Sequence, residues 1–138
     1  MGSAQQVKRA ALITAHAEGI SVEVFERVLL RAFRQALGRR TGIYALYDKR
    51  RPYYVGLASS LRSRIKDHTS DHLSGKWDRF SFFEVKKKKY LKDVESLAIR
   101  IANPVANKAR PDFCSHHNIK RKVIRDMLIV VKKGVYGG

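Results

Sequence analysis

Two short apolar segments with strand-like composition lie close together in the chain, at residues 42–47 and 53–57. The linker between them, residues 48–52, is polar and contains a proline, which is typical of the turn of a β-hairpin. The two segments therefore predict an antiparallel hairpin.

The pairing of this hairpin decides on which face its tyrosines lie. If Tyr47 pairs with Tyr53, then Tyr44 lies opposite Gly56, and Tyr54 lies on the same face as Tyr44. Both phenol groups then point to one side of the sheet. Simple cross-strand packing of aromatic residues is the alternative interpretation.

Helical spacing, N-capping serines and β-rich runs predict the remaining elements. Ser21 is a suitable N-cap for one helix, and Ser59 or Ser60 for another. The predicted helices cover residues 4–17, 21–37, about 60–68 and 90–103, the last of them ended by Pro104. The predicted strands beyond the hairpin are residues 79–85, apolar on both faces and therefore central, and residues 128–131.

These elements predict an α/β (α+β) fold with a small antiparallel or mixed three-stranded sheet flanked by helices. We divide the chain into an N-terminal helical extension (residues 1–40), a core (residues 41–107) and a basic C-terminal extension packed on the core (residues 108–138).

The chain is strongly basic, with 29 Lys and Arg against 12 Asp and Glu, a formal charge of +17 and a pI near 10.4. The excess is spread along the whole chain, so the expected partner is a polyanion, first of all nucleic acid. A ribosomal protein or a protein of anionic membrane surfaces has a similar balance, so charge alone does not indicate an enzyme.

The single cysteine, Cys114, excludes an intrachain disulfide framework and favours a reducing compartment. We expect a cytoplasmic or nucleoid-associated protein without a membrane partner, because no apolar run approaches the roughly 20 residues that span a bilayer. The segment Cys114-Ser115-His116-His117 lacks the paired ligand spacing of structural zinc sites, so zinc is not favoured.

Glu95 is the polar residue that helical periodicity marks most clearly. Its neighbours on the predicted helix face are apolar: Leu91, Ala98, and Ile101 or Ala102. A carboxylate on an inward face costs several kcal/mol, roughly, unless a cation offsets it. A divalent metal is one such cation, and a salt bridge to Arg64 is the other.

The order of short motifs resembles that of the GIY-YIG nuclease family over residues 41–107. The matching residues are Gly42-Ile43-Tyr44, Tyr54-Val55-Gly56, Arg64 and His68 on one helix, Glu95 on a later helix, and Asn107 after a proline. Each tripeptide alone is weak, but the combination at these spacings is specific.

The resemblance implies a DNA endonuclease that uses Mg²⁺ or Mn²⁺ and no small-molecule cofactor. It implies that Glu95 holds the metal, that Tyr44 acts on the attacking water and that Arg64 stabilises the phosphate. It further implies that Tyr54 orients the phosphate or water and that His68 relays a proton. Gly42, Gly56 and Asn107 are expected to be structural. The chain departs from many members at Leu57, where they have a lysine, so a second cation near the phosphate is in doubt.

Clusters of basic residues are expected to contact nucleic-acid phosphates without reading bases. They are Lys49, Arg50, Arg51, Arg62, Lys86, Lys87, Lys88 and Lys89. A noncatalytic nucleic-acid-binding module of the same fold is the alternative function, and a basic RNA or ribosome-associated protein is a third. RNA is not excluded as the substrate, and the oligomeric state stays open.

Overall fold

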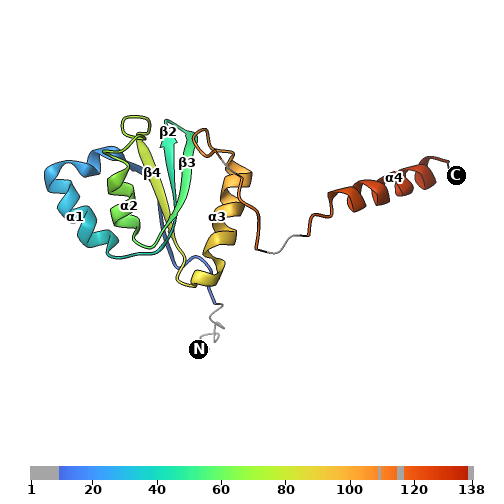
Figure 1. The fold of residues 1–138 in the computed structure, drawn as a ribbon, viewed down its shortest axis with the longest axis horizontal. Coiled ribbons are helices and arrows are strands. Elements are labelled where there is room, and N and C mark those ends of the chain that lie inside the picture. The colour runs from blue at the N-terminus through green and yellow to red at the C-terminus, as the bar shows by residue number, and fades with distance from the viewer. Residues whose placement is uncertain (1–9, 109, 115–116, 137–138) are drawn as a thin grey trace, which may run out of the picture.

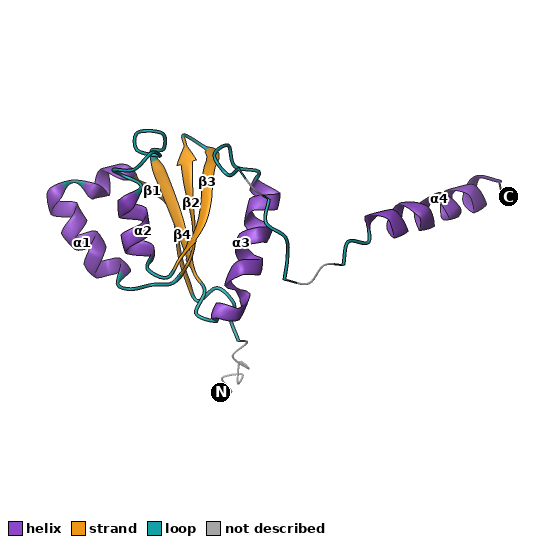
Figure 2. Ribbon diagram, viewed as in Figure 1, coloured by secondary structure: helices purple, strands orange, loops and turns teal. Residues whose placement is uncertain are grey.

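A four-stranded antiparallel sheet forms the centre of the fold, with strand order β1-β4-β2-β3 (Figure 2). The computed structural model describes residues 10–108, 110–114 and 117–136. The strands are β1 (Ala15–Ser21), β2 (Gly42–Asp48), β3 (Arg51–Ala58) and β4 (Arg79–Glu84). The helices are a 3-10 turn η1 (Val22–Phe25), α1 (Arg27–Leu37), α2 (Leu61–Asp67), α3 (Lys88–Ala102) and α4 (Lys120–Tyr136).

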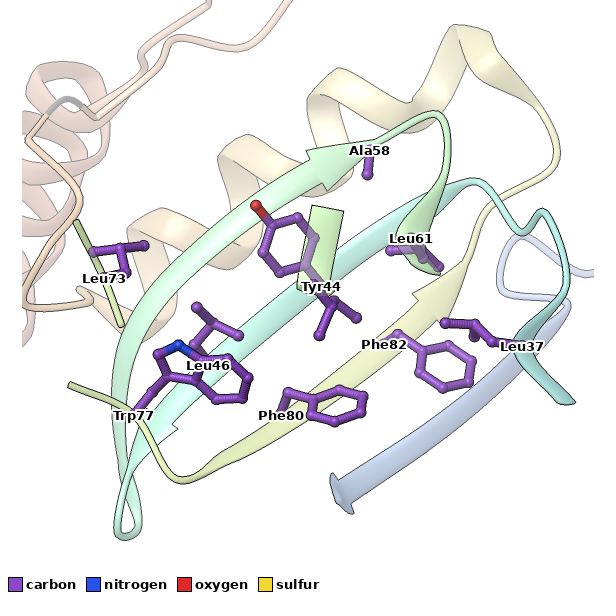
Figure 3. Close-up of a cluster of buried hydrophobic side chains, with 10 residues drawn as sticks. Leu37, Tyr44, Leu46, Ala58, Leu61, Leu73, Trp77, Phe80 and Phe82 are labelled. Carbon is purple, nitrogen blue, oxygen red and sulfur yellow. The ribbon is translucent and has the colours of Figure 1, made fainter. Parts of the chain in front are cut away.

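Helices cover both faces of the sheet, with α1 and α2 on one side and α3 on the other (Figure 1). For this reason successive side chains of β2 are buried on alternate faces of the sheet. Tyr44 and Leu46 belong to the cluster under α1 and α2, whereas Ile43 and Ala45 pack with α3. Figure 3 shows the larger cluster, which also holds aromatic side chains of β4. The fold class is as predicted.

The hairpin has the predicted register over most of its length. Tyr44 pairs with Gly56, and the strand boundaries extend slightly beyond the predicted ones. A bulge after Leu46 shifts the pairing, so Tyr47 lies opposite Pro52 instead of Tyr53. The bulge lies next to the turn, where one extra residue is easily accommodated.

The predicted helix over residues 4–17 is wrong where the structure describes it, because residues 15–21 form β1. The predicted sheet of three strands therefore has four. β1 pairs with the edge of β4 that β2 leaves free, and this tertiary pairing outweighs the helix propensity of the alanines. Its ladder is interrupted between Ala17 and Ile20, at Gly19, which has a φ of 69°. Residues 4–9 lie outside the described residues.

The predicted helix over residues 21–37 is interrupted. Ser21 caps a single 3-10 turn by accepting the N–H of Glu23 at 3.3 Å, and Glu26 is extended before α1 begins. Gly38 ends α1 as predicted, with a φ of 61°. The break lets Phe25 turn back onto Phe80 and Trp77 in the core.

The predicted strand over residues 128–131 is also wrong, because these residues lie within α4. A short apolar run has no periodicity of its own that separates strand from helix. The apolar residues before it, Val123, Ile124 and Met127, continue it at helical spacing, and α4 lies apart from the sheet (Figure 1).

The C-terminal extension packs on the core only in its first part. Ser96 and Arg100 of α3 donate hydrogen bonds to the backbone of Asp112 and Pro111, respectively. Residues 120–134 of α4 are all exposed instead of packed on the core. The boundaries after residues 40 and 107 stay predictions. Among the helices that the structure describes, none combines the length and apolarity needed to cross a membrane.

Gly42 gives the first test of this architecture. A Cβ at this position would collide with the carbonyl oxygen of Phe83 in β4, so Gly42→Ala must push the two central strands apart. We expect a loss of roughly 1–3 kcal/mol in the free energy of unfolding, measured by urea denaturation. Gly134→Ala in exposed α4 is the matched control, because no atom lies within 4 Å of its added Cβ. Equal stability of Gly42→Ala and wild type would contradict the close pairing.

Candidate active site

Tyr44 and Tyr54 lie on the same face of the sheet, beneath α2, as their register in the hairpin predicts. Their ring centroids are 6.1 Å apart. Tyr44 is fully buried and Tyr54 half-buried. Figure 3 shows the Tyr44 ring among the apolar side chains of the same face.

Gly56 makes room for the hydroxyl end of Tyr44. A Cβ on Gly56 would lie 2.5 Å from the Tyr44 hydroxyl oxygen and 2.6 Å from the ring carbon that carries it. Any other residue opposite Tyr44 would therefore displace the phenol group. Tyr44 of the Gly42-Ile43-Tyr44 motif therefore requires Gly56 of the Tyr54-Val55-Gly56 motif.

The Tyr44 hydroxyl begins a chain of hydrogen bonds that leads from the buried interior toward the loop after α2. Its oxygen lies 2.6 Å from Nε2 of His68, and Nδ1 of His68 lies 2.7 Å from Oδ2 of Asp71. The other carboxylate oxygen of Asp71 accepts the backbone N–H of Leu73 at 2.9 Å. The three side chains come from β2, the end of α2 and the loop that follows.

His68 is as deeply buried as the apolar stripe of α2. Leu61 and Ile65 form that stripe, and His68 is only 2% exposed. It is the C-cap of α2, and its backbone carbonyl accepts the indole N–H of Trp77 at 3.0 Å. The last turn of the helix and the loop therefore hold the imidazole in place.

Asp71 is a site residue that the sequence reasoning missed. Its only signal is its position three residues after His68, and the sequence does not indicate that the chain turns back there. Backbone bonds from Ser70 and Asp71 to the carbonyl of Asp67 make that turn.

Arg64 is exposed and Arg62 is half-buried. The side chain of Arg64 nevertheless reaches Tyr44, since the pKa of the guanidinium is raised mainly by its attraction to the phenolate form of that tyrosine. A flexible cation therefore lies next to the buried hydroxyl.

Burial controls the ionisation of the two buried groups. It raises the pKa of Tyr44 far above its usual value of 10.0, with a smaller effect from Tyr54, although Arg64 acts in the opposite direction. Burial also lowers the pKa of His68 below 6.5, against the opposing effect of Asp71. Near pH 7 both side chains are neutral.

An open groove lies beside Arg64, between the N-terminal ends of α2 and α3. Its volume is about 540 Å³. Leu57 and Leu91 line it together with the cations Arg64 and Lys88. Lys88 of α3 thus lines the same groove as Leu57, which stands where many family members have a lysine.

Glu95 is half-buried on α3, beside β3. Burial raises the pKa of its carboxyl, while the backbone N–H of Leu57 acts in the opposite direction. Among the ion pairs of the described residues none includes Glu95, so the salt bridge to Arg64 is not formed. The backbone of Leu57, next to Gly56 in β3, contacts the Glu95 carboxylate.

The buried face of α3 differs from the predicted one. Ser96 and Ile99 are its buried residues, and Leu91 and Ala98 are half-buried. Ile101 is 77% exposed, so Ala102 is the inward member of the predicted pair. Glu95 therefore lies at the border of the buried face.

Asn107 holds the outer edge of β3. Its Nδ2 donates to the carbonyl of Val55 at 2.8 Å, and its Oδ1 accepts the Val55 N–H at 2.9 Å. Ala106 adds a backbone bond to Tyr53. Together they bind the loop after α3 to the strand that carries Tyr54 and Gly56.

The two basic clusters lie at opposite ends of the sheet. Lys49, Arg50 and Arg51 are exposed at the hairpin turn, whereas the exposed Lys86–Lys89 run follows the other end of β4. The run is not wholly a loop, because Lys88 and Lys89 already belong to α3. Of these lysines and arginines, Lys88 alone shares the groove with Arg64.

The described residues contain no group of three or more His, Cys, Asp and Glu side chains that could hold a metal ion. The segment from Cys114 to His117 lies only partly within the described residues, since Ser115 and His116 are outside them.

The family model of the GIY-YIG catalytic domain matches residues 40–101. The fold is similar to crystal structures of the GIY-YIG N-terminal endonuclease domain of UvrC from Thermotoga maritima. A Tyr-to-Phe variant bound to its catalytic divalent cation gives a TM-score of 0.51 at 18% identity, covering 61% of this chain and 100% of that one. The domain bound to magnesium gives 0.50 at 18% identity, covering 59% and 99%.

No curated protein sequence matches the chain. At such low identity the structural likeness shows the fold alone. The chain therefore has the fold of the GIY-YIG endonuclease domain of UvrC, and its residues 40–101 match the model of the GIY-YIG catalytic domain.

Proposed function

We propose that this protein is a divalent-metal-dependent endonuclease that hydrolyses phosphodiester bonds of DNA, with Tyr44, Arg64 and Glu95 as its main catalytic residues. The position of Glu95 carries the proposal. It is a half-buried carboxylate without an ion-pair partner among the described residues. It accepts the backbone N–H of Leu57, and Leu57 lines the groove that contains Arg64. A cation would offset the cost of burying this carboxylate, and the negatively charged phosphates of the substrate backbone need a cation as well.

The donor set fits Mg²⁺ or Mn²⁺. Magnesium is commonly bound by one or two carboxylates, with waters and substrate phosphate oxygens as the other ligands, and Glu95 supplies one carboxylate. The UvrC domain with the same fold is bound to a catalytic divalent cation, which supports the assignment. When bound, the metal would neutralise charge on the phosphate and on the leaving oxygen.

Arg64 stabilises the phosphate in this proposal. Its exposed guanidinium can offer two parallel N–H donors to phosphate oxygens. Lys88, across the groove, supplies the second positive charge and contacts the same or the next phosphate. These two cations then stabilise the negative charge that develops on the phosphate in the transition state.

Tyr44 accepts a proton from the attacking water. In the free protein its hydroxyl is buried, and Arg64 lies beside it. This role requires that substrate binding gives a water access to the hydroxyl. Because burial disfavours the phenolate, Tyr44 must pass its own proton on as it accepts one, and His68 is the neighbour that can receive it. Tyr54 orients the phosphate or the water.

DNA is the proposed substrate because the protein carries a charge of +17 and a nuclease fold similar to that of UvrC. Residues 41–107 are proposed to carry the chemistry, and the segments before and after them to add substrate contacts. Exposed Arg50 and Arg51 at the hairpin turn extend the basic surface.

Glu95→Gln tests the metal assignment. We expect loss of Mn²⁺ binding by electron paramagnetic resonance, and a fall of about 100-fold or more in Mg²⁺-dependent nicking of supercoiled plasmid. Glu26→Gln is the matched control, because Glu26 is exposed and its side chain makes no capping bond.

Full activity in chelator, or in Glu95→Gln, would overturn the metal role. Branched DNA and RNA are incubated in parallel. Tight, salt-sensitive binding without cleavage of any of these substrates would instead favour the noncatalytic binding module.

Tyr44→Phe removes the hydroxyl and keeps the ring in the core. We expect single-turnover cleavage to fall about 100-fold or more, while DNA affinity by fluorescence anisotropy is unchanged. Tyr47→Phe in the same strand is the control, since the side-chain hydrogen bonds of the described residues do not include Tyr47. Unchanged cleavage by Tyr44→Phe across pH would exclude the proposed role.

The pH profile follows from His68, which can accept a proton only while neutral. Since burial lowers its pKa, we expect kcat/KM to fall with decreasing pH at a midpoint below 6.5. The melting temperature should also begin to fall below about pH 6.5, because the unfolded chain binds this proton before the folded one does. A midpoint above that value would contradict a buried, neutral acceptor.

A further inference from the structure

Asp71 uses both oxygens of its carboxylate on two different partners. One accepts from Nδ1 of His68 at 2.7 Å, and the other accepts the backbone N–H of Leu73 at 2.9 Å. The pKa of Asp71 is lowered, and backbone and imidazole hydrogen bonds act in that direction against desolvation. Near pH 7 the carboxylate is ionised, so it accepts hydrogen bonds and donates none.

This arrangement decides which nitrogen of His68 carries its proton. A carboxylate beside Nδ1 requires a hydrogen there, which leaves Nε2 of the neutral ring as an acceptor. Nε2 faces the Tyr44 hydroxyl at 2.6 Å, and the hydroxyl must therefore donate. The hydrogen bonds run in one direction, from Tyr44 through His68 to Asp71.

The ring has little freedom to depart from this arrangement. It is 2% exposed, its own carbonyl accepts the indole N–H of Trp77, and the Tyr54 ring lies 5.4 Å away, centroid to centroid. The titratable and charged groups around the ring are Tyr44 from β2, Tyr54 from β3, Arg64 and Asp67 from α2, and Asp71 from the following loop.

We propose that Asp71 is a positioning residue of the cleavage reaction, which holds His68 in the Nδ1–H tautomer so that Nε2 takes the proton of Tyr44. The inference rests on the proposed function. As the water oxygen bonds to phosphorus, the water gives a proton to the Tyr44 oxygen, and the Tyr44 proton moves to Nε2. The bond from phosphorus to the leaving oxygen breaks, and that oxygen takes a proton from solvent. The imidazolium left beside Asp71 later returns its proton through Tyr44.

A purely structural role is the alternative, because Asp71 also anchors the loop through Leu73. The positioning role and the structural role predict opposite orders of cleavage rate for Asp71→Asn and Asp71→Ala. In Asp71→Asn the amide oxygen must still face the Leu73 N–H, so the amide NH₂ faces Nδ1 of His68. An NH₂ group there forces the Nε2–H tautomer, which donates to Tyr44 and blocks the transfer.

Asp71→Ala removes the carboxylate without imposing a tautomer. The positioning role therefore predicts that the conservative Asp71→Asn is slower than Asp71→Ala. A loop anchor predicts that Asp71→Asn, which keeps the bond to Leu73, is the milder change.

The test combines ¹⁵N NMR of the histidine rings with single-turnover cleavage of plasmid DNA. We expect Nδ1–H in wild type and Nε2–H in Asp71→Asn, with cleavage by Asp71→Asn reduced about 100-fold or more and below that of Asp71→Ala. Asp67→Asn is the matched control, since it removes a charge near His68 without a hydrogen bond to the ring. It should keep the wild-type tautomer.

An Nε2–H ring in wild type would overturn the inference, and this measurement needs no variant to fold. Cleavage by Asp71→Asn at the wild-type rate, or above that of Asp71→Ala, would also overturn it and leave the nuclease function intact. A wild-type protein that cleaves no nucleic acid would refute the proposed function and with it the role in cleavage, while the spectra would still decide the tautomer.

Discussion

The double pairing of β2 is the constraint on which the rest of the fold depends. The strand bonds to β3 on one edge and β4 on the other, and it is covered by α2 on one face and α3 on the other. Two glycines make this possible. Gly42 admits the backbone of β4, and Gly56 admits the hydroxyl end of Tyr44. The two glycines of the sequence motif are thus required for packing, whatever the motif implies about chemistry.

Because Tyr44 is enclosed by this packing, its hydroxyl must have a hydrogen-bond partner inside the protein. A buried hydroxyl without a partner costs roughly 1–3 kcal/mol, and His68 removes that cost. His68 in turn is held by Asp71 and Trp77. The groups that stabilise the interior are therefore the ones proposed to move protons, so the same hydrogen bonds serve the fold and the reaction.

The hairpin, its register, α2 and α3 were predictable because each shows a local pattern in the sequence: alternation, a capping serine or helical spacing. β1 was not predictable from Ala15 and Ala17, since they form a strand only because β4 offers a free edge. The run Ile129-Val130-Val131 has strand-forming residues, yet it pairs with none of the four strands and continues a helix.

The residues of the site divide in the same way, into those that a local sequence pattern predicts and those that tertiary contacts bring together. Tyr44, Tyr54 and Gly56 come together through a register that the sequence contains. Asp71 joins His68 only because the chain turns after α2, and Lys88 faces Arg64 only because two helix ends meet at one groove. Contacts made by loops and by helix packing have no spacing rule to reveal them.

The separation of the two basic clusters sets how long a nucleic-acid strand would have to be to contact both of them. They lie beyond opposite ends of β2, a strand of 7 residues that spans about 20 Å at roughly 3.3 Å per residue. Successive phosphates of one DNA strand advance by about 3.4 Å, so a strand that touches both clusters must extend over about six nucleotides. Fragments below that length would leave one cluster without contacts, and a nuclease built in this way would release its smallest products readily.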